Sequence, residues 1–535
     1  MQNQIIPTQD TTKPNQKRKQ FWSYALLFLI TALGLFLRTY HIETAPPGIY
    51  PDEAVNGQDA IRALETGSFQ WFYTANQGRE GLFMNLIAFC FKFFGISILT
   101  LKLPAIIFGT LTILGTYLLT KELFQKERVS LIAAFLYAVS FWAINFNRIS
   151  FRANMLPFIL VFTFYFLFKA IRTKKFHHFA ISGFIFGVGV HTYIAFRIAP
   201  LILIILLSSF ILSQKKFLQT YWKHILVFIA AMFIAAAPML YTFYAHPEFF
   251  ESRSDSISVF SPAINQGHPF LTMLKSFGLS LAKFNFWGDQ NWRHNYPPYP
   301  VLDPLVGIAF LFGSIYSIVT LLQLAKNRLI HKQRDIRMNI YVLLITWFFA
   351  MLVPEFMTAE GLPHALRSIG SLPPVIIFAA IAFEYFLAKS QQHPKLHKIT
   401  TTAFIILLLV SIGLFNSIKY HYFWANKEKV GLSFNKNLTD ISKYIQTLPI
   451  QKEKFVVTSY NFIEKAPIEI FTHPNNTFFA YPNELSKINP QNSNDFMIFF
   501  TEYNQEAITE MQQKFPRLTF SETDGSLGSV YYILK

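Results

Sequence analysis

Two adjacent carboxylates, Asp52 and Glu53, follow the first long apolar run of the chain, at the end of the segment PPGIYPDE. They stand out because only 14% of the 535 residues are Asp, Glu, Lys or Arg. A carboxylate in a polar loop beside a membrane can accept a proton from a reacting hydroxyl group at the boundary between water and lipid. The alternative is a helix start, since acidic side chains are favoured in the first turn of a helix.

A set of arginines forms the second group of residues suited to chemistry. They lie between apolar runs, in segments that we expect on the same side of the membrane as Asp52. Arginine forms charge-assisted, bidentate hydrogen bonds with phosphate and carboxylate groups. Convergence of the set predicts a bound anion, for which a lipid-linked phosphate is the natural candidate; the alternatives are lipid head groups or internal salt bridges. The set comprises Arg148, Arg152, Arg197, Arg293 and Arg367.

Glu80, His191 and His364 are further candidates, for binding an acceptor or a metal. The alternative for Glu80 is again a helix start, and a lone histidine near a helix end is more often packed or hydrogen-bonded than functional. A divalent metal held by Asp52, Glu80 and a histidine is left open, because the sequence supplies no fixed ligand spacing. The single cysteine, Cys90, excludes an internal disulfide and a cysteine-rich metal site.

Membrane-spanning helices are the elements that must position these residues. The chain is 52% hydrophobic, contains 60 phenylalanines and has a mean hydropathy of +0.32. Apolar runs of about 18 residues or more recur, and each can cross a hydrocarbon core about 30 Å thick as a helix. We therefore predict an α-helical polytopic membrane protein with about eleven transmembrane helices. The predicted spans are 21–38, 98–120, 129–146, 155–170, 179–195, 198–213, 224–243, 304–324, 339–354, 371–388 and 399–418.

The positive charges of the loops indicate the orientation of these spans. Every loop expected in the cytoplasm is basic, as is usual for membrane proteins, so the net charge of +17 does not indicate nucleic-acid binding. The N-terminus is predicted to be cytoplasmic, and an odd number of spans places the C-terminus outside. The basic loops contain Lys121 and Arg128, Arg172 and Lys175, Lys215 and Lys223, Lys326 and Arg337, and Lys389 and Lys398.

The chain divides into a cytoplasmic tail (1–20), a transmembrane domain (21–424) and an extracytoplasmic α/β domain (425–535). The transmembrane domain carries two long outer loops, 39–97 and 244–303, and loops of this length are usually functional or disordered. In the first loop we expect helices over Glu53–Glu65 and Glu80–Phe94, the latter along the membrane interface. In the C-terminal domain, short apolar runs bounded by turn residues predict strands at 455–460, 495–500 and 530–534, with helices at 438–447 and 504–514.

These features resemble the GT-C class of integral-membrane glycosyltransferases. The similarity is to the dolichyl-phosphate-mannose–protein mannosyltransferase superfamily (glycosyltransferase family 39) and to the aminoarabinose transferases of lipid A. It is good over about 20–250, looser through the second long loop and weak in the C-terminal domain. One departure is Gly81, where the Glu-Pro-Leu-Phe pattern of the family has proline. The segments that carry the resemblance are Tyr50–Ala54, Arg79–Phe83, the loop with Arg148 and Arg152, and His191–Tyr193 with Arg197.

The resemblance implies an inverting transfer of a sugar from a polyprenyl-phosphate carrier to an acceptor hydroxyl on the outer face of the cytoplasmic membrane. Asp52 would be the general base, and Glu53 would orient it, bind the acceptor or ligate a metal. The arginines would hold the donor phosphate. Likeness to bacterial members implies a bacterial cell membrane and undecaprenyl phosphate as carrier, while the sugar and the acceptor (protein, lipid or glycan) stay open. No glycine-rich loop indicates a nucleotide site.

The main alternative is a transporter of polyprenyl lipids or solutes in the cell envelope. A transporter should carry ionisable residues near the middle of its spans, whereas most charges here lie in the loops. A further alternative is a non-catalytic scaffold of envelope assembly with the same fold. The sequence therefore favours an enzyme that works at the membrane surface.

Overall fold

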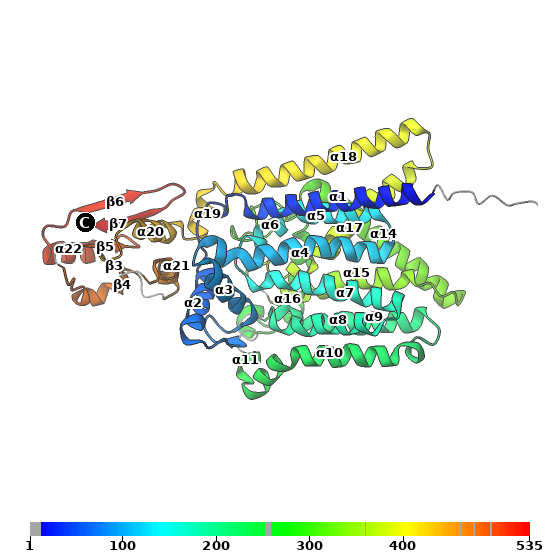
Figure 1. Ribbon diagram of the computed structural model, residues 1–535, viewed down its shortest axis with the longest axis horizontal. Coiled ribbons are helices and arrows are strands. Elements are labelled where there is room, and N and C mark those ends of the chain that lie inside the picture. The colour runs from blue at the N-terminus through cyan, green and yellow to red at the C-terminus, as the bar shows by residue number, and fades with distance from the viewer. Residues whose placement is uncertain (1–11, 252–257, 359, 459–461, 475–476, 493–494) are drawn as a thin grey trace, which may run out of the picture.

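The computed structural model describes residues 12–251, 258–358, 360–458, 462–474, 477–492 and 495–535. Most of the expected N-terminal tail and the last two residues of the strand expected at 455–460 lie outside these ranges. Figure 1 shows a bundle of long helices that run roughly parallel, with a smaller domain of strands and helices beyond one end of the bundle. The N-terminal helix enters from the opposite end.

Nine helices of the described residues are long and apolar enough to cross a membrane, and a bent pair makes a tenth. The helical polytopic class is thus confirmed. The expected count of eleven is not, because α8, Phe176–Val188, has only 13 residues where a span was predicted at 179–195. The nine are Gln20–Thr39 in α1 (Thr12–Thr39), α4 (Ile98–Phe124), Arg152–Thr173 ending in α7 (Met155–Thr173), Ile194–Ser213 ending in α9 (Ala199–Ser213), α10 (Phe217–Ala245), α14 (Pro304–Ile330), Arg337–Phe356 with α15 (Arg337–Ala350) and α16 (Val353–Phe356), Ile369–Ser390 ending in α17 (Leu372–Ser390), and Lys395–Trp424 with α18 (Lys395–Ile418).

The bent pair carries the chain to the end of the bundle that lies next to the smaller domain (Figure 1). It consists of α5, Glu127–Val139, and α6, Phe141–Asn147, which meet at an angle of 55°. Ser140 has extended backbone angles and its hydroxyl accepts a hydrogen bond from the N–H of Ala143, so it caps the start of α6. All residues of α6 are buried, and the segment that follows them holds Arg148 and Arg152.

Glycines allow α8 to pack closely against α10. A Cβ atom at Gly183 would overlap the carbonyl oxygen of Phe228, and one at Gly187 would overlap that of Met232. Small residues four positions apart let the backbones of two helices approach in this way. Helix α8 has too few residues to cross a membrane on its own. These contacts hold it beside α10, a helix of 29 residues.

Replacing Gly183 and Gly187 by alanine should lower the melting temperature of the purified protein in detergent. Each added methyl group must push the two backbones apart, at a cost of roughly 1–3 kcal/mol. The matched control is Gly278→Ala in α13, Pro269–Ala282, because a Cβ there has nothing within 4 Å. Equal melting temperatures for the double variant and this control would show that the glycines do not set the helix contact.

The first outer loop folds into two helices joined by a short hairpin. Helix α2, Pro51–Thr66, and helix α3, Leu82–Phe94, lie close to the two predicted ranges. The hairpin pairs β1, Phe72–Tyr73, with β2, Arg79–Glu80, and so fixes the position of Glu80. One face of α3 is buried, whereas Phe93 and Phe94 are each 70% exposed, as expected of a helix that lies along a membrane surface.

The C-terminal domain is a five-stranded sheet between two layers of helices. The strand order is β4-β3-β5-β7-β6; β3 is parallel to β4 and β5, and β7 is antiparallel to β5 and β6. One face of the sheet packs on α22 and the other on α20 and α21. The bounds are α20 Lys436–Thr447, β3 Glu453–Val457, α21 Phe462–Thr472, β4 Thr477–Ala480, β5 Phe496–Phe500, α22 Gln505–Lys514, β6 Phe520–Asp524 and β7 Val530–Leu534.

This domain packs directly on the first outer loop. Side chains of α21, including Ala466 and Ile470, share a hydrophobic cluster with α2 and α3. The amide of Gln58 in α2 donates a hydrogen bond of 2.5 Å to Glu469. The C-terminal domain therefore covers α2, the helix that carries Asp52 (Figure 1).

Candidate functional site

The two carboxylates at the start of α2 have different surroundings. Glu53 is fully buried; its carboxylate accepts hydrogen bonds from the N–H of Tyr50 at 3.2 Å and of Ser150 at 2.7 Å, and lies 4.0 Å from the ammonium of Lys102. Burial raises the pKa of Glu53, although Lys102 and the two N–H groups act in the opposite direction. The side chain of Asp52 is half-exposed and accepts a hydrogen bond of 2.8 Å from Asn76.

Glu53 therefore joins two loops from the interior, whereas Asp52 is partly exposed. The interior position of Glu53 is the reason that we assign it no catalytic part, contrary to the expectation from the sequence. Its bond to the N–H of Ser150 ties α2 to the segment between α6 and α7. Asn154 stabilises the same segment by donating hydrogen bonds to the carbonyls of Phe146, Ile149 and Phe151.

Arg152 belongs to this segment between α6 and α7 and forms an ion pair with Glu80 of the hairpin. The guanidinium donates a hydrogen bond of 2.6 Å to the Glu80 carboxylate, and it lies 5.6 Å from the centre of the Tyr193 ring. Arg197 interacts electrostatically with both members of the pair. Three residues predicted from separate segments, Glu80, Arg152 and Arg197, thus lie together.

The adjacent Gly81 explains the departure from the proline of the resembled pattern. Its N–H donates a hydrogen bond of 2.7 Å to the carbonyl of Trp71, a bond that proline cannot form. A Cβ at this position would also overlap the carbonyl oxygen of Gln70. The hairpin that orients Glu80 is therefore closed by backbone contacts that only a glycine permits.

A cavity of about 370 Å³ adjoins this cluster. Arg197 and Arg367 both line it, as do Tyr193 and His364. Arg197 stacks on the ring of Phe250 at 4.1 Å and donates to the carbonyl of the same residue. The guanidinium of Arg367 is held by Thr358 at 2.8 Å and by the exposed carboxylate of Glu360 at 2.9 Å. The positively charged side chains of Arg197 and Arg367 therefore line the same cavity.

Arg293 packs against the residue that precedes α2. Its guanidinium lies 4.1 Å from the centre of the ring of Tyr50, the residue that precedes α2. Arg293 and Arg367 both interact electrostatically with His364. The described residues that line the cavity do not include Asp52, whose carboxylate lies in the first turn of α2, two residues after Tyr50.

Arg148 and His191, two further predicted residues, bond to backbone carbonyl groups and do not line the cavity. Arg148 is fully buried, and its guanidinium donates to the carbonyls of Leu37 and Ala45. It joins α1 to the first outer loop, so we do not propose it as a phosphate ligand. His191 bonds the carbonyl of Ala235 at 2.9 Å and lies beside Trp71, which is the packed alternative for a histidine at a helix end.

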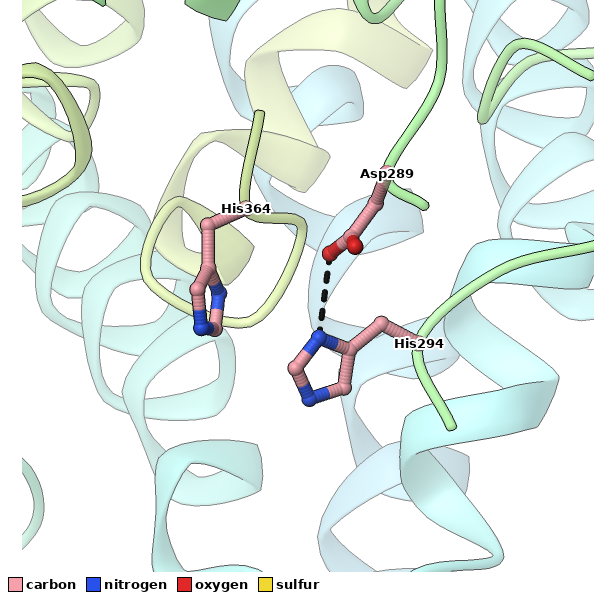
Figure 2. Close-up of side chains that lie close together, drawn as sticks. All are labelled: Asp289, His294 and His364. Carbon is pink, nitrogen blue, oxygen red and sulfur yellow. Dashed lines mark hydrogen bonds and ion pairs between the residues drawn. The ribbon is translucent and has the colours of Figure 1, made fainter. Parts of the chain in front are cut away.

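His364, a candidate from the sequence, lies in a cluster with Asp289 and His294 that the sequence did not bring together (Figure 2). Asp289 Oδ2 lies 3.0 Å from His294 Nδ1, and the rings of His294 and His364 are 4.7 Å apart between centres. Burial, and next the neighbouring His294, lower the pKa of His364 well below its ordinary value, so this imidazole is neutral at pH 7. Of the described residues, this is the group whose ligand atoms are close enough to hold a metal ion; Asp52 and Glu80 do not form one with a histidine.

Comparison with known proteins places these features in a wider class. Residues 82–241 match the family model of dolichyl-phosphate-mannose-protein mannosyltransferase. No curated protein sequence matches the chain significantly.

Two solved structures share the fold. The oligosaccharyltransferase AglB of Archaeoglobus fulgidus is 16% identical, with a TM-score of 0.51 over 94% of this chain and 70% of that one. ArnT of Cupriavidus metallidurans is 11% identical, with a TM-score of 0.52 over 95% and 97% of the two chains. The chain is therefore a multi-span membrane protein with the GT-C glycosyltransferase fold, and it resembles the dolichyl-phosphate-mannose–protein mannosyltransferase superfamily.

Proposed function

We propose that the protein transfers a sugar from a polyprenyl-phosphate carrier to an acceptor hydroxyl group on the outer face of the cytoplasmic membrane. The observation that carries this proposal is that Arg197 and Arg367 line one cavity. Arg152 lies against Tyr193 in its wall, and Arg293 lies against Tyr50, two residues before Asp52. The similar structures agree with such a donor: AglB was solved with a dolichol-phosphate and an inhibitory peptide, and ArnT with undecaprenyl phosphate.

The reaction is a single displacement at the anomeric carbon of the sugar. The acceptor oxygen forms a bond to this carbon as the bond from the carbon to the phosphate oxygen breaks, so the configuration inverts. The proton of the acceptor hydroxyl passes to the Asp52 carboxylate. The electron pair of the broken bond stays with the lipid phosphate, and its added negative charge is stabilised by Arg197 and Arg367.

Glu80 and Tyr193 have positioning parts in this proposal. The Glu80 carboxylate holds the Nε of Arg152, and the Tyr193 ring lies beneath the guanidinium and also lines the cavity. A guanidinium fixed in this way does not have to reorganise when charge develops on the phosphate, which is the main source of electrostatic catalysis. Arg152 is thus not a lining residue of the cavity; it acts through Tyr193, which is one.

Reconstitution with a lipid extract tests the proposal against the transporter. The purified protein in vesicles, given polyprenyl-phosphate sugars and an envelope extract as acceptor, should release polyprenyl phosphate in step with glycosylated product. A strain that lacks the gene should accumulate the polyprenyl-phosphate sugar, measured by mass spectrometry of its lipids. Movement of the lipid across the vesicle membrane without cleavage of the sugar–phosphate bond would favour the transporter instead.

A further inference from the structure

We propose that Asp289, His294 and His364 form a binding site for a divalent cation of the zinc type, which joins the second outer loop to the loop before α17. Asp289 and His294 belong to the first of these loops and His364 to the second. Two imidazoles and one carboxylate are a donor set that zinc accepts. Neither the fold nor the proposed sugar transfer requires this site, so it stands on its own geometry.

The positions of the ligand atoms fit a single ion. One donor atom from each residue lies within 4.8 Å of the other two. Adjacent ligands on a tetrahedral zinc ion, at bond lengths of about 2.0–2.1 Å, are about 3.3 Å apart, and Asp289 Oδ2 and His294 Nδ1 are already 3.0 Å apart. A small movement of the His364 ring toward this pair closes the site. Figure 2 shows the His364 ring opposite the pair, across a short gap.

An unsatisfied nitrogen gives a second, independent indication of a ligand. Among the described residues, Nδ1 of His364 is buried without any hydrogen-bond partner, although buried polar atoms are normally paired. Asp289 is 1% and His294 5% exposed, while His364 is partly exposed at the wall of the cavity. A metal ion at the centre of the cluster supplies the missing partner.

Hydrogen bonds from residues around the cluster hold the proposed ligands in place, as they do around most metal ligands. The N–H of Ala365 donates a hydrogen bond of 2.7 Å to Asp289, and the N–H of His364 donates one of 2.9 Å to Glu355. Glu355 also pairs with the buried ammonium of Lys283, and Glu360 pairs with Arg367. Two of the nearby cations are therefore paired with carboxylates, which lessens their repulsion of a bound metal ion. The third, Arg293, donates a hydrogen bond of 3.0 Å to Asn291 and lies against the Tyr50 ring.

The competing explanation is a metal-free contact in which Nδ1–H of His294 donates a hydrogen bond to the Asp289 carboxylate. The two explanations differ in what binds to the purified protein. Full-length protein, freed of metal with a chelator and titrated with Zn²⁺, should take up one ion per chain, measured by elemental analysis after desalting. Co²⁺ should bind in its place and give the intense visible absorption of a four-coordinate site.

Substitutions at the cluster complete the test. His294→Gln and His364→Gln should each lower retained Zn²⁺ by at least tenfold, and zinc should raise the melting temperature of the unaltered protein but not theirs. The matched control is His246→Gln, which alters a histidine 3.3 Å from a carboxylate, that of Glu248, outside the cluster. Failure of the unaltered protein to retain zinc, or equal retention by the cluster variants, would overturn the proposal. Because no sugar donor is present, the result is independent of transferase activity.

Discussion

Asp52→Asn should lower sugar transfer by about 10²–10⁴-fold, the usual contribution of a general base, and leave the fold intact. The substitution keeps the size of the side chain and an oxygen that can accept the hydrogen bond from Asn76. It removes the basic oxygen that takes the acceptor proton. The measurement is the initial rate of polyprenyl-phosphate release by reconstituted protein, together with a melting curve for each variant.

Two variants serve as controls for this prediction. Asp495→Asn makes the same chemical change at a half-exposed carboxylate that pairs with Lys452 in the C-terminal domain, and it should leave the rate unchanged. Glu53→Gln should lower the melting temperature, because the interior carboxylate that faces Lys102 is lost. A rate for Asp52→Asn equal to that of the unaltered protein would remove Asp52 from the mechanism.

Arg197→Gln and Arg367→Gln should each lower the turnover rate by about 10²–10³-fold, as removal of one charge-stabilising donor does in other enzymes. Both side chains line the cavity in which we place the departing phosphate. The loss should be larger for turnover than for binding of the donor, since the charge on the phosphate grows as the bond breaks. Turnover and the Michaelis constant, measured separately with the same lipid extract, distinguish these effects.

Arg172→Gln is the matched control for the arginine variants. Arg172 also pairs with a carboxylate, Glu122, but it lies in a loop predicted at the cytoplasmic side. Its substitution should leave both kinetic constants unchanged. If Arg197→Gln and Arg367→Gln behaved like this control, the cavity would not be the phosphate site.

The class of polytopic helical membrane protein could be predicted because it depends on the length of apolar runs and on the charges of the loops. Both are local properties of the sequence. Spans such as 98–120 and 304–324 lie within α4 and α14. Helix α8 shows the limit of this reasoning. The chain leaves the regular helix at Gly189 and forms a 3-10 turn through His191, although the apolar run continues. Apolar composition alone does not reveal where a helix in the membrane ends.

The arginines show why the site could be predicted only in part. Arg148 and Arg152 stand four residues apart in the segment NRISFRAN, and nothing in their local pattern distinguishes them. The end of α6 and the turn braced by Asn154 direct Arg148 to carbonyls in the interior and Arg152 to Glu80. Their different surroundings come from contacts with α1 and the hairpin, which are remote in sequence.

His364 was a candidate from the sequence, but its grouping with Asp289 and His294 was missed for a related reason. His364 follows Asp289 by 75 positions, and metal sites are recognised in a sequence through short, fixed spacings. The five-residue interval between Asp289 and His294 was the one local signal. Packing of the second outer loop against the loop before α17 then brings the third ligand into place.

Equilibrium binding of undecaprenyl phosphate to three forms of the purified protein distinguishes lipid binding from proton transfer. In the proposed mechanism, the group that takes the proton is separate from the groups that hold the lipid phosphate. Asp52→Asn should therefore bind the lipid as the unaltered protein does while failing in transfer, whereas the double variant Arg197→Gln, Arg367→Gln should lose both. Equal lipid binding by all three forms would contradict the assignment of the cavity, and so would a loss of binding in Asp52→Asn alone.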